Sequence, residues 1–153
     1  MSGPSVIGWR ERVDLPAWGV TRLLAKADSG ARSSAVHAEN IAELPGERVA
    51  FEVVYSRAHP EHRQRVECDI ARRVRVRSSS GHADERLVVR TELVIGPFRR
   101  EVELTLVSRE LMSCRMLIGR TALDGLLVDP SRTYLLTRPP HAGPGVRPRK
   151  RTS

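Results

Sequence analysis

Apolar and polar residues alternate along most of this chain, in short runs that end at turns rich in glycine, proline or serine. Alternation with a period of two is typical of a β-strand that buries one face. It predicts strands over residues 5–12, 21–27, 33–41, 48–55, 72–77, 85–95, 99–107, 116–118 and 133–136. Loops or turns are expected at 15–20, 43–47, 57–64, 78–81 and 96–97, and a turn or helical piece at 108–113.

Residues 121–127 are the one stretch with a helical composition, and Gly125 is expected to break that helix after about one turn. Many short strands with a single short helix near the C-terminus predict an all-β fold, either a barrel or a sandwich. A chain of 153 residues that is 40% apolar can bury one real core. We therefore expect one domain over residues 1–137.

The remaining residues, 138–153, carry five arginines and lysines, no acid and several prolines and glycines, which predicts a disordered basic tail. Such a tail can touch nucleic acid non-specifically, or it can simply be solvated. The rest of the chain holds 21 of the 26 basic residues against all 18 acidic ones, and Lys26 is its sole lysine. Arginine pairs with carboxylates and phosphates through two parallel hydrogen bonds, so this part could recognise an anion. An aromatic content of 4% argues against stacking platforms for RNA or single-stranded DNA.

The compartment can be inferred from what the sequence lacks. It has no run of about 18 apolar residues that would span a membrane, and residues 1–9 do not resemble a secretory leader. Cys68 and Cys114 are too few for a disulfide framework, which indicates reduced thiols. We expect a cytoplasmic protein that does not contact a membrane.

Three features follow one another in a fixed order. Asp28-Ser29-Gly30 ends a predicted strand, a hairpin over residues 74–95 carries Gly81 at its tip, and Leu117-Ile118-Gly119-Arg120 precedes the predicted helix. Asp-Ser-Gly alone is a weak signal, since many surface turns contain it. The order of all three is far more specific.

That order resembles the retropepsins, in which an Asp-Thr/Ser-Gly loop presents the catalytic carboxylate, a β-hairpin flap covers the substrate, and an apolar-apolar-Gly strand passes behind the loop. A bacterial family often named ATP-dependent zinc proteases, and since described as retropepsin-like, resembles the chain from about residue 6 to residue 136. The matching segments are residues 26–38, 76–82 and 116–120, together with Gly8-Trp9-Arg10 and residues 128–131. Ser29 stands where threonine is usual, and it keeps the hydroxyl. The resemblance implies a closed acid-protease barrel.

It also implies an aspartic peptidase with Asp28, Ser29 and Gly30 as catalytic residues. Such chemistry needs two carboxylates that share one proton about a single water. The chain has one Asp-Ser-Gly, so the second carboxylate must come from a second copy in a two-fold homodimer. A plain surface turn at Asp28 remains the alternative.

Neither a metal nor a nucleotide is expected, whatever the family's older name implies. The sequence lacks His-Glu-x-x-His, paired Cys-x-x-Cys and a phosphate-binding Gly-x-x-x-x-Gly-Lys-Ser/Thr. His59 and His62 with Cys68 could chelate zinc by accident, but they fall in or beside a polar loop. We expect no cofactor.

The resemblance further points to a partner of a ribosomal-protein glutamate ligase, with a peptidase that trims the added C-terminal glutamates. An acidic substrate needs fixed cations, and the candidate substrate-binding residues are Lys26, Arg32, Arg73, Arg75, Arg77, Ser78, Ser79, His82, Arg90 and Arg120. The arginine face of residues 73–77 could instead be merely solvated, and Arg32 and Arg120 could be structural. Two further alternatives are a non-catalytic β-barrel module that binds an acidic partner or RNA, and a metallopeptidase.

Overall fold

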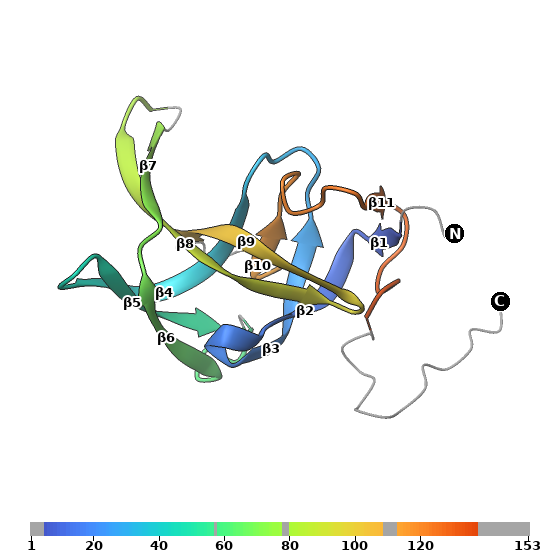
Figure 1. Ribbon diagram of the computed structural model, residues 1–153, viewed down its shortest axis with the longest axis horizontal. Helices are drawn as coiled ribbons and strands as arrows, with labels where there is room; N and C mark the ends of the chain where they lie inside the picture. Colours follow the sequence, from blue (N-terminus) through green and yellow to red (C-terminus); the bar gives the residue numbers. More distant parts are fainter. Residues whose placement is uncertain (1–4, 57, 78–79, 109–112, 138–153) are drawn as a thin grey trace.

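The computed structural model describes residues 5–56, 58–77, 80–108 and 113–137 (Figure 1). Ser78, Ser79, residues 109–112 and the predicted tail at 138–153 lie outside the described residues. Within them the structure has one short 3-10 helix, η1 (Pro16–Trp18), and eleven strands. The strands are β1 (Val6–Gly8), β2 (Arg10–Leu15), β3 (Val20–Ala27), β4 (Ser34–Leu44), β5 (Arg48–Val54), β6 (Arg63–Asp69), β7 (Arg72–Arg77), β8 (Ala83–Ile95), β9 (Phe98–Val107), β10 (Met116–Ile118) and β11 (Leu127–Asp129).

Six strands close into a barrel, which confirms the predicted all-β barrel. The order around it is β10, β3, β2, β8, β9 and β4, and β4 pairs again with β10. β2 alternates half-buried and buried residues, with Glu11, Val13 and Leu15 facing inward. The interior is filled by aliphatic side chains, and Trp18 of η1 packs edge-on against Phe51 with ring centroids 5.1 Å apart.

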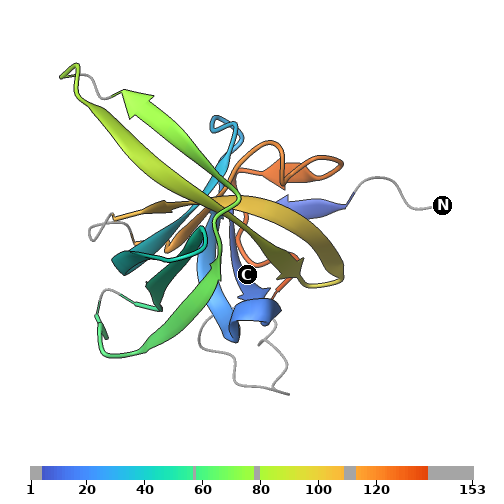
Figure 2. The same ribbon diagram turned by 60° about the vertical axis from the view of Figure 1, so that its left-hand side comes forward.

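Three extensions leave this barrel. β5 and β6 continue the sheet outward from β4. β7 pairs with the first half of β8 to form a hairpin that projects from the barrel in both views (Figures 1 and 2). β1 and β11 form a separate two-stranded parallel sheet. In both views the β3–β4 loop lies at the top of the barrel, with the hairpin to its left and the small sheet to its right (Figures 1 and 2).

Two predicted elements near the C-terminus are wrong. Residues 121–125 are turns rather than a helix, because Gly125 adopts a φ of +81° and Leu127 is already part of β11. Residues 133–136 are not a strand. The amides of Leu135 and Leu136 donate instead to the side chain of Glu11, which is 1% exposed.

Glu11 ties this C-terminal segment to the barrel. Its carboxylate accepts hydrogen bonds from the backbone N–H of Gly8 (2.8 Å), Leu135 (2.9 Å), Leu136 (3.1 Å) and Thr137 (3.0 Å), and from the Thr137 hydroxyl (2.6 Å). A carboxylate accepts in this way because it has two oxygens and no donor. Three further hydrogen bonds join the segment to Trp9 and β2: the Trp9 amide donates to the Arg132 carbonyl (2.9 Å), the Tyr134 amide donates to the Arg10 carbonyl (2.9 Å), and the Arg12 amide donates to the Thr137 hydroxyl oxygen (2.9 Å). The segment over residues 132–137 is therefore held by one buried side chain together with these contacts.

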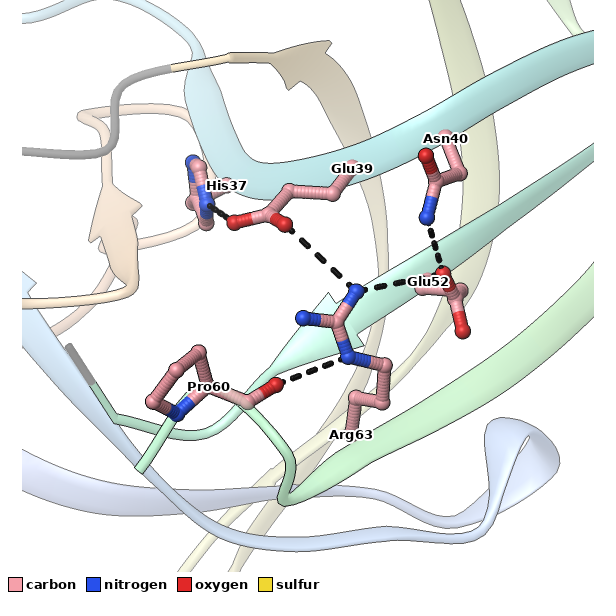
Figure 3. Close-up of polar contacts among 6 residues, drawn as sticks. All are labelled: His37, Glu39, Asn40, Glu52, Pro60 and Arg63. Carbon is pink, nitrogen blue, oxygen red and sulfur yellow. Dashed lines mark hydrogen bonds and ion pairs between the residues drawn. The ribbon is translucent and has the colours of Figure 1, made fainter. Parts of the chain in front are cut away.

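The sequence also missed β6 and merged β1 with β2. β6 is an edge strand of mostly polar residues in which Val66 is the buried one, so its alternation is weak. A polar network ties β6 to β4 and β5 (Figure 3). Arg63 lies 3.5 Å from Glu39 and 3.2 Å from Glu52, and Glu39 in turn is 2.9 Å from Nε2 of the fully buried His37.

Candidate active site

Asp28 follows β3 directly and begins the loop that leads to β4. β10 lies between these two strands, parallel to β3 and antiparallel to β4. The Asp28 amide donates to the Ile118 carbonyl (2.8 Å), and the Gly30 amide donates to Asp28 Oδ1 (3.0 Å). The carboxylate is thus held at the rim of the barrel, partly exposed, with its orientation fixed by its own loop.

The strand behind the loop crosses it at Gly119. The Gly119 amide donates to the buried Ser34 hydroxyl (2.9 Å), and the next amide, from Arg120, donates to the Ala31 carbonyl (2.8 Å). A Cβ at residue 119 would lie 2.5 Å from the backbone carbon and oxygen of Ser33. Glycine is therefore required for this crossing.

Three predicted cations surround the loop. Lys26 and Arg32 are exposed on either side of Asp28, and within the described residues neither forms an ion pair. Arg120 donates instead to the carbonyls of Ser29 (3.3 Å) and Gly30 (3.4 Å). Arg120 thus has a structural contact with the Asp28 loop, one of the two roles that the sequence left open.

A cleft of about 700 Å³ lies between the β7–β8 hairpin, β9 and the end of the Asp28 loop. It is lined by Arg32, Ser33, Arg72, Val74, Val76, Glu101, Val102, Glu103, Thr105, Thr121 and Ala122. Its walls therefore combine aliphatic surface with charged groups of both signs. A pocket of this size and composition suits a peptide side chain with an apolar stem and a charged end.

The face of β7 that lines the cleft is the valine face, not the arginine face. Arg73 points the other way, where its guanidinium binds Glu43 (2.7 Å), Glu85 (3.0 Å) and Glu47 (3.3 Å). The hydrogen bonds that Arg73 donates to these carboxylates, Glu43 first, raise the pKa of Arg73 above its usual value.

The other predicted hairpin residues divide between the two strands. Arg75 and Arg77 share the Arg73 face, because alternate residues of a strand share a face. Arg90 of β8 is bound to Glu103 (3.0 Å). His82 is exposed immediately before β8. Among the predicted substrate-binding cations, Arg32 of the Asp28 loop lines the cleft. A substrate contact of the hairpin cations stays a prediction.

Comparison with known proteins identifies the family. Residues 6–139 match the model of the RimB-like family, described as retropepsin-like aspartic endopeptidase RimB. The chain belongs to the RimB-like family. The match covers nearly the whole barrel and includes the Asp28 loop, the hairpin and the β10 crossing. The resemblance recognised in the sequence is thereby confirmed.

Several relatives of this RimB-like chain are named "Probable alpha-L-glutamate ligase". One from Shewanella pealeana is 38% identical over 140 residues, covering 86% of this chain and 30% of the relative. One from Parasynechococcus marenigrum is 35% identical over 142 residues, covering 89% of this chain and 30% of the relative. The chain thus spans less than a third of these ligases. A solved structure from Legionella pneumophila, of unknown function, superposes with a TM-score of 0.72 at 25% identity and covers 87% of this chain and 98% of that one.

Across the described part of the chain, no three His, Cys, Asp or Glu side chains gather into a group that could hold a metal ion. His62 stacks on Tyr55 with ring centroids 4.3 Å apart, while burial raises the pKa of the Cys68 thiol to about 11. No helix among the described residues is long and apolar enough to cross a membrane.

Sequence reasoning missed three residues that shape the site. Arg72 and Glu103 line the cleft, and Ser34 anchors the β10 crossing. Ser34 gave no signal, since a serine at the start of a strand is common. Arg72 could have been found, because the alternation of residues 72–77 places it on the same face as the two valines.

Proposed function

We propose that this protein is an aspartic peptidase that hydrolyses peptide bonds in acidic, glutamate-rich protein tails, and that two copies of the chain form one active site. Asp28 of each copy supplies one carboxylate of the pair that activates the water. One carboxylate acts as a base on the water, and the other donates a proton to the scissile carbonyl. The position of Asp28 in the β3–β4 loop, backed by β10, is the observation that carries the proposal.

The need for a homodimer follows from chemistry and is supported by the surface beside the loop. Trp9, which follows β1, accepts a hydrogen bond from the amide of Ala27 (2.9 Å), the residue before Asp28. The adjoining β1–β11 sheet exposes Val6 (41%) and Leu127 (55%). An apolar surface next to an incomplete catalytic site suits a contact between two copies.

Two observations support an acidic substrate. Lys26, Arg32 and Arg120 place positive charge around Asp28, which favours a negatively charged chain. The ligase name of the relatives also connects this barrel with glutamate chemistry, since they carry a similar region within one polypeptide. We therefore propose as substrate a C-terminal tail of added glutamates, such as one on a ribosomal protein. Free thiols at Cys68 and Cys114 support a cytoplasmic location.

The test is mass spectrometry of a peptide with a C-terminal oligoglutamate tail, incubated with wild type, Asp28→Asn and the matched control Asp124→Asn. Asp124 is an exposed aspartate outside the loop. We expect wild type and the control to remove glutamates, and Asp28→Asn to lose about 10²–10⁴-fold in rate, as expected for removal of an acid–base group. Retained cleavage by Asp28→Asn would rule out the aspartic mechanism.

A second function has one observation in its favour. The curated relatives contain this region as 30% of a ligase, so it could serve as a non-catalytic module that binds an acidic partner. Binding of the oligoglutamate peptide by wild type, without cleavage under any condition in which the dimer is folded, would favour that module over the peptidase.

A further inference from the structure

Two neighbouring arginines of the hairpin have opposite surroundings. Arg72 lines the cleft together with Val74 and Val76, whereas Arg73 is turned toward the β4–β5 turn and is bound by three glutamates. This follows from the pleat, since consecutive residues of a strand point to opposite faces. Of the two, Arg72 is therefore the one that a substrate in the cleft can reach.

Arg72 already holds a carboxylate inside the cleft. Its Nε and Nη2 donate to Oε1 of Glu103 at 3.1 and 2.9 Å. The second oxygen of Glu103, Oε2, accepts from Arg90 at 3.0 Å. Hydrogen bonds from Arg72 and then Arg90 lower the pKa of Glu103. If Arg72 turns to another carboxylate, Glu103 remains paired with Arg90, so the exchange leaves no charge without a partner.

The charges around the cleft leave room for one more carboxylate. Arg32 and Arg72 line the cleft together with Glu101 and Glu103. Arg90 of β8 lies outside the lining and pairs with both glutamates, at 3.8 Å from Glu101 and 3.0 Å from Glu103. Three positive groups against two negative ones leave one positive charge, which a single substrate carboxylate would balance. The adjacent valines can cover the two methylene groups of a glutamate side chain.

We propose that Arg72 selects the acidic substrate by exchanging Glu103 for a glutamate carboxylate of the bound peptide. This deepens the proposed function and rests on it for the class of substrate. It assigns specificity to a residue outside the sequence-derived candidates and gives Glu103 the role of an internal stand-in for the substrate. Arg73, despite its adjacent position, holds the base of the hairpin.

The test measures binding in the Asp28→Asn background of the full chain, by fluorescence anisotropy with labelled oligoglutamate and oligoglutamine peptides. Arg72→Gln should weaken oligoglutamate binding about tenfold, the size of one charge-assisted bidentate contact, and should leave oligoglutamine binding nearly unchanged. Arg99→Gln is the matched control, because Arg99 is an exposed strand arginine that also holds one glutamate, Glu92 (2.8 Å). Arg72→Lys, which keeps the charge but loses the fork, should fall between wild type and Arg72→Gln.

Glu103→Gln tests the same exchange in the opposite direction. It should tighten oligoglutamate binding, since the competing carboxylate is gone, and the gain should vanish in the double variant with Arg72→Gln. The inference is overturned if Arg72→Gln weakens both peptides equally, if Arg73→Gln or Arg99→Gln matches its effect, or if the parent Asp28→Asn protein does not distinguish the two peptides. Selective binding through Arg72 with no cleavage by the protein carrying Asp28 would instead refute the peptidase and leave this inference standing.

Discussion

Replacing Glu11 by glutamine changes one atom of the buried group that fixes the C-terminal segment. Glu11 Oε2 accepts from the amides of Gly8, Leu135 and Leu136, while Oε1 accepts from the amide and hydroxyl of Thr137. Glutamine keeps the shape and one carbonyl oxygen. Its NH₂ group, however, must face either the Thr137 side or the other three donors, and it cannot accept from them.

The cost can be estimated from these contacts. The favourable orientation keeps three amide bonds but makes them neutral, which weakens each by roughly 0.5–1 kcal/mol. It also sets the Thr137 N–H against a second donor, which costs about 1–3 kcal/mol when the group is buried. The hydroxyl can rotate to accept, and relief of burying a charge offsets part of the loss. We expect a net loss of about 3 kcal/mol in the free energy of unfolding.

Urea unfolding of Glu11→Gln and the exposed control Glu67→Gln, at pH 7, measures this loss. The control should change stability by less than about 0.5 kcal/mol, since Glu67 lies in a surface pair with Arg65. Hydrogen exchange should show lost protection at the amides of residues 135–137 in Glu11→Gln. A loss below about 1 kcal/mol with those amides still protected would refute the view that Glu11 holds the segment.

Two further predictions concern the crossing and acid stability. Gly119→Ala should destabilise the fold by about 3 kcal/mol in urea unfolding and abolish peptidase activity, because its Cβ meets the Ser33 backbone at 2.5 Å; full stability and activity would contradict this. Hydrogen bonds lower the pKa of Glu52, through Asn40 and then Arg63, and the pKa of Glu103. Carboxylates with lowered folded-state pKa values stabilise the fold above their unfolded pKa of about 4.3. The urea midpoint should therefore drop as pH falls from about 5 to 3, and drop less in Glu52→Gln.

The barrel could be predicted because its strands bury one face. β9 alternates, with Val102, Leu104 and Leu106 at 6%, 0% and 3% exposure, so its sequence carries both the period and the identity of the inner face. β6 buries Val66 against otherwise partly exposed or exposed residues, and such an edge strand leaves almost no periodic trace. Prediction thus succeeded where burial was one-sided and failed where it was slight.

The C-terminal segment shows a different limit. Residues 133–136 have the composition of a strand, but the amides of Leu135 and Leu136 bind a carboxylate that is more than 120 residues away in sequence. No local pattern records such a partner. Glu11 itself lies between Arg10 and Arg12 and reads as an ordinary charged residue, and its burial at 1% depends on the segment that covers it.

The hairpin shows which structural information the alternating sequence of a strand carries and which it lacks. The sequence of β7 correctly places three arginines on one face and valines on the other, yet most of its residues are exposed, so burial does not mark either face as inner. The alternation alone therefore did not tell which face of β7 turns toward the cleft. Charge complementarity to an acidic substrate favoured the arginine face. In the structure the valine face lines the cleft, and Glu43 and Glu47, outside the hairpin, bind Arg73. A substrate contact of the arginine face stays a prediction. If an acidic chain binds in this cleft, as we propose, the β7 cation that meets it is Arg72, which lies on the valine face.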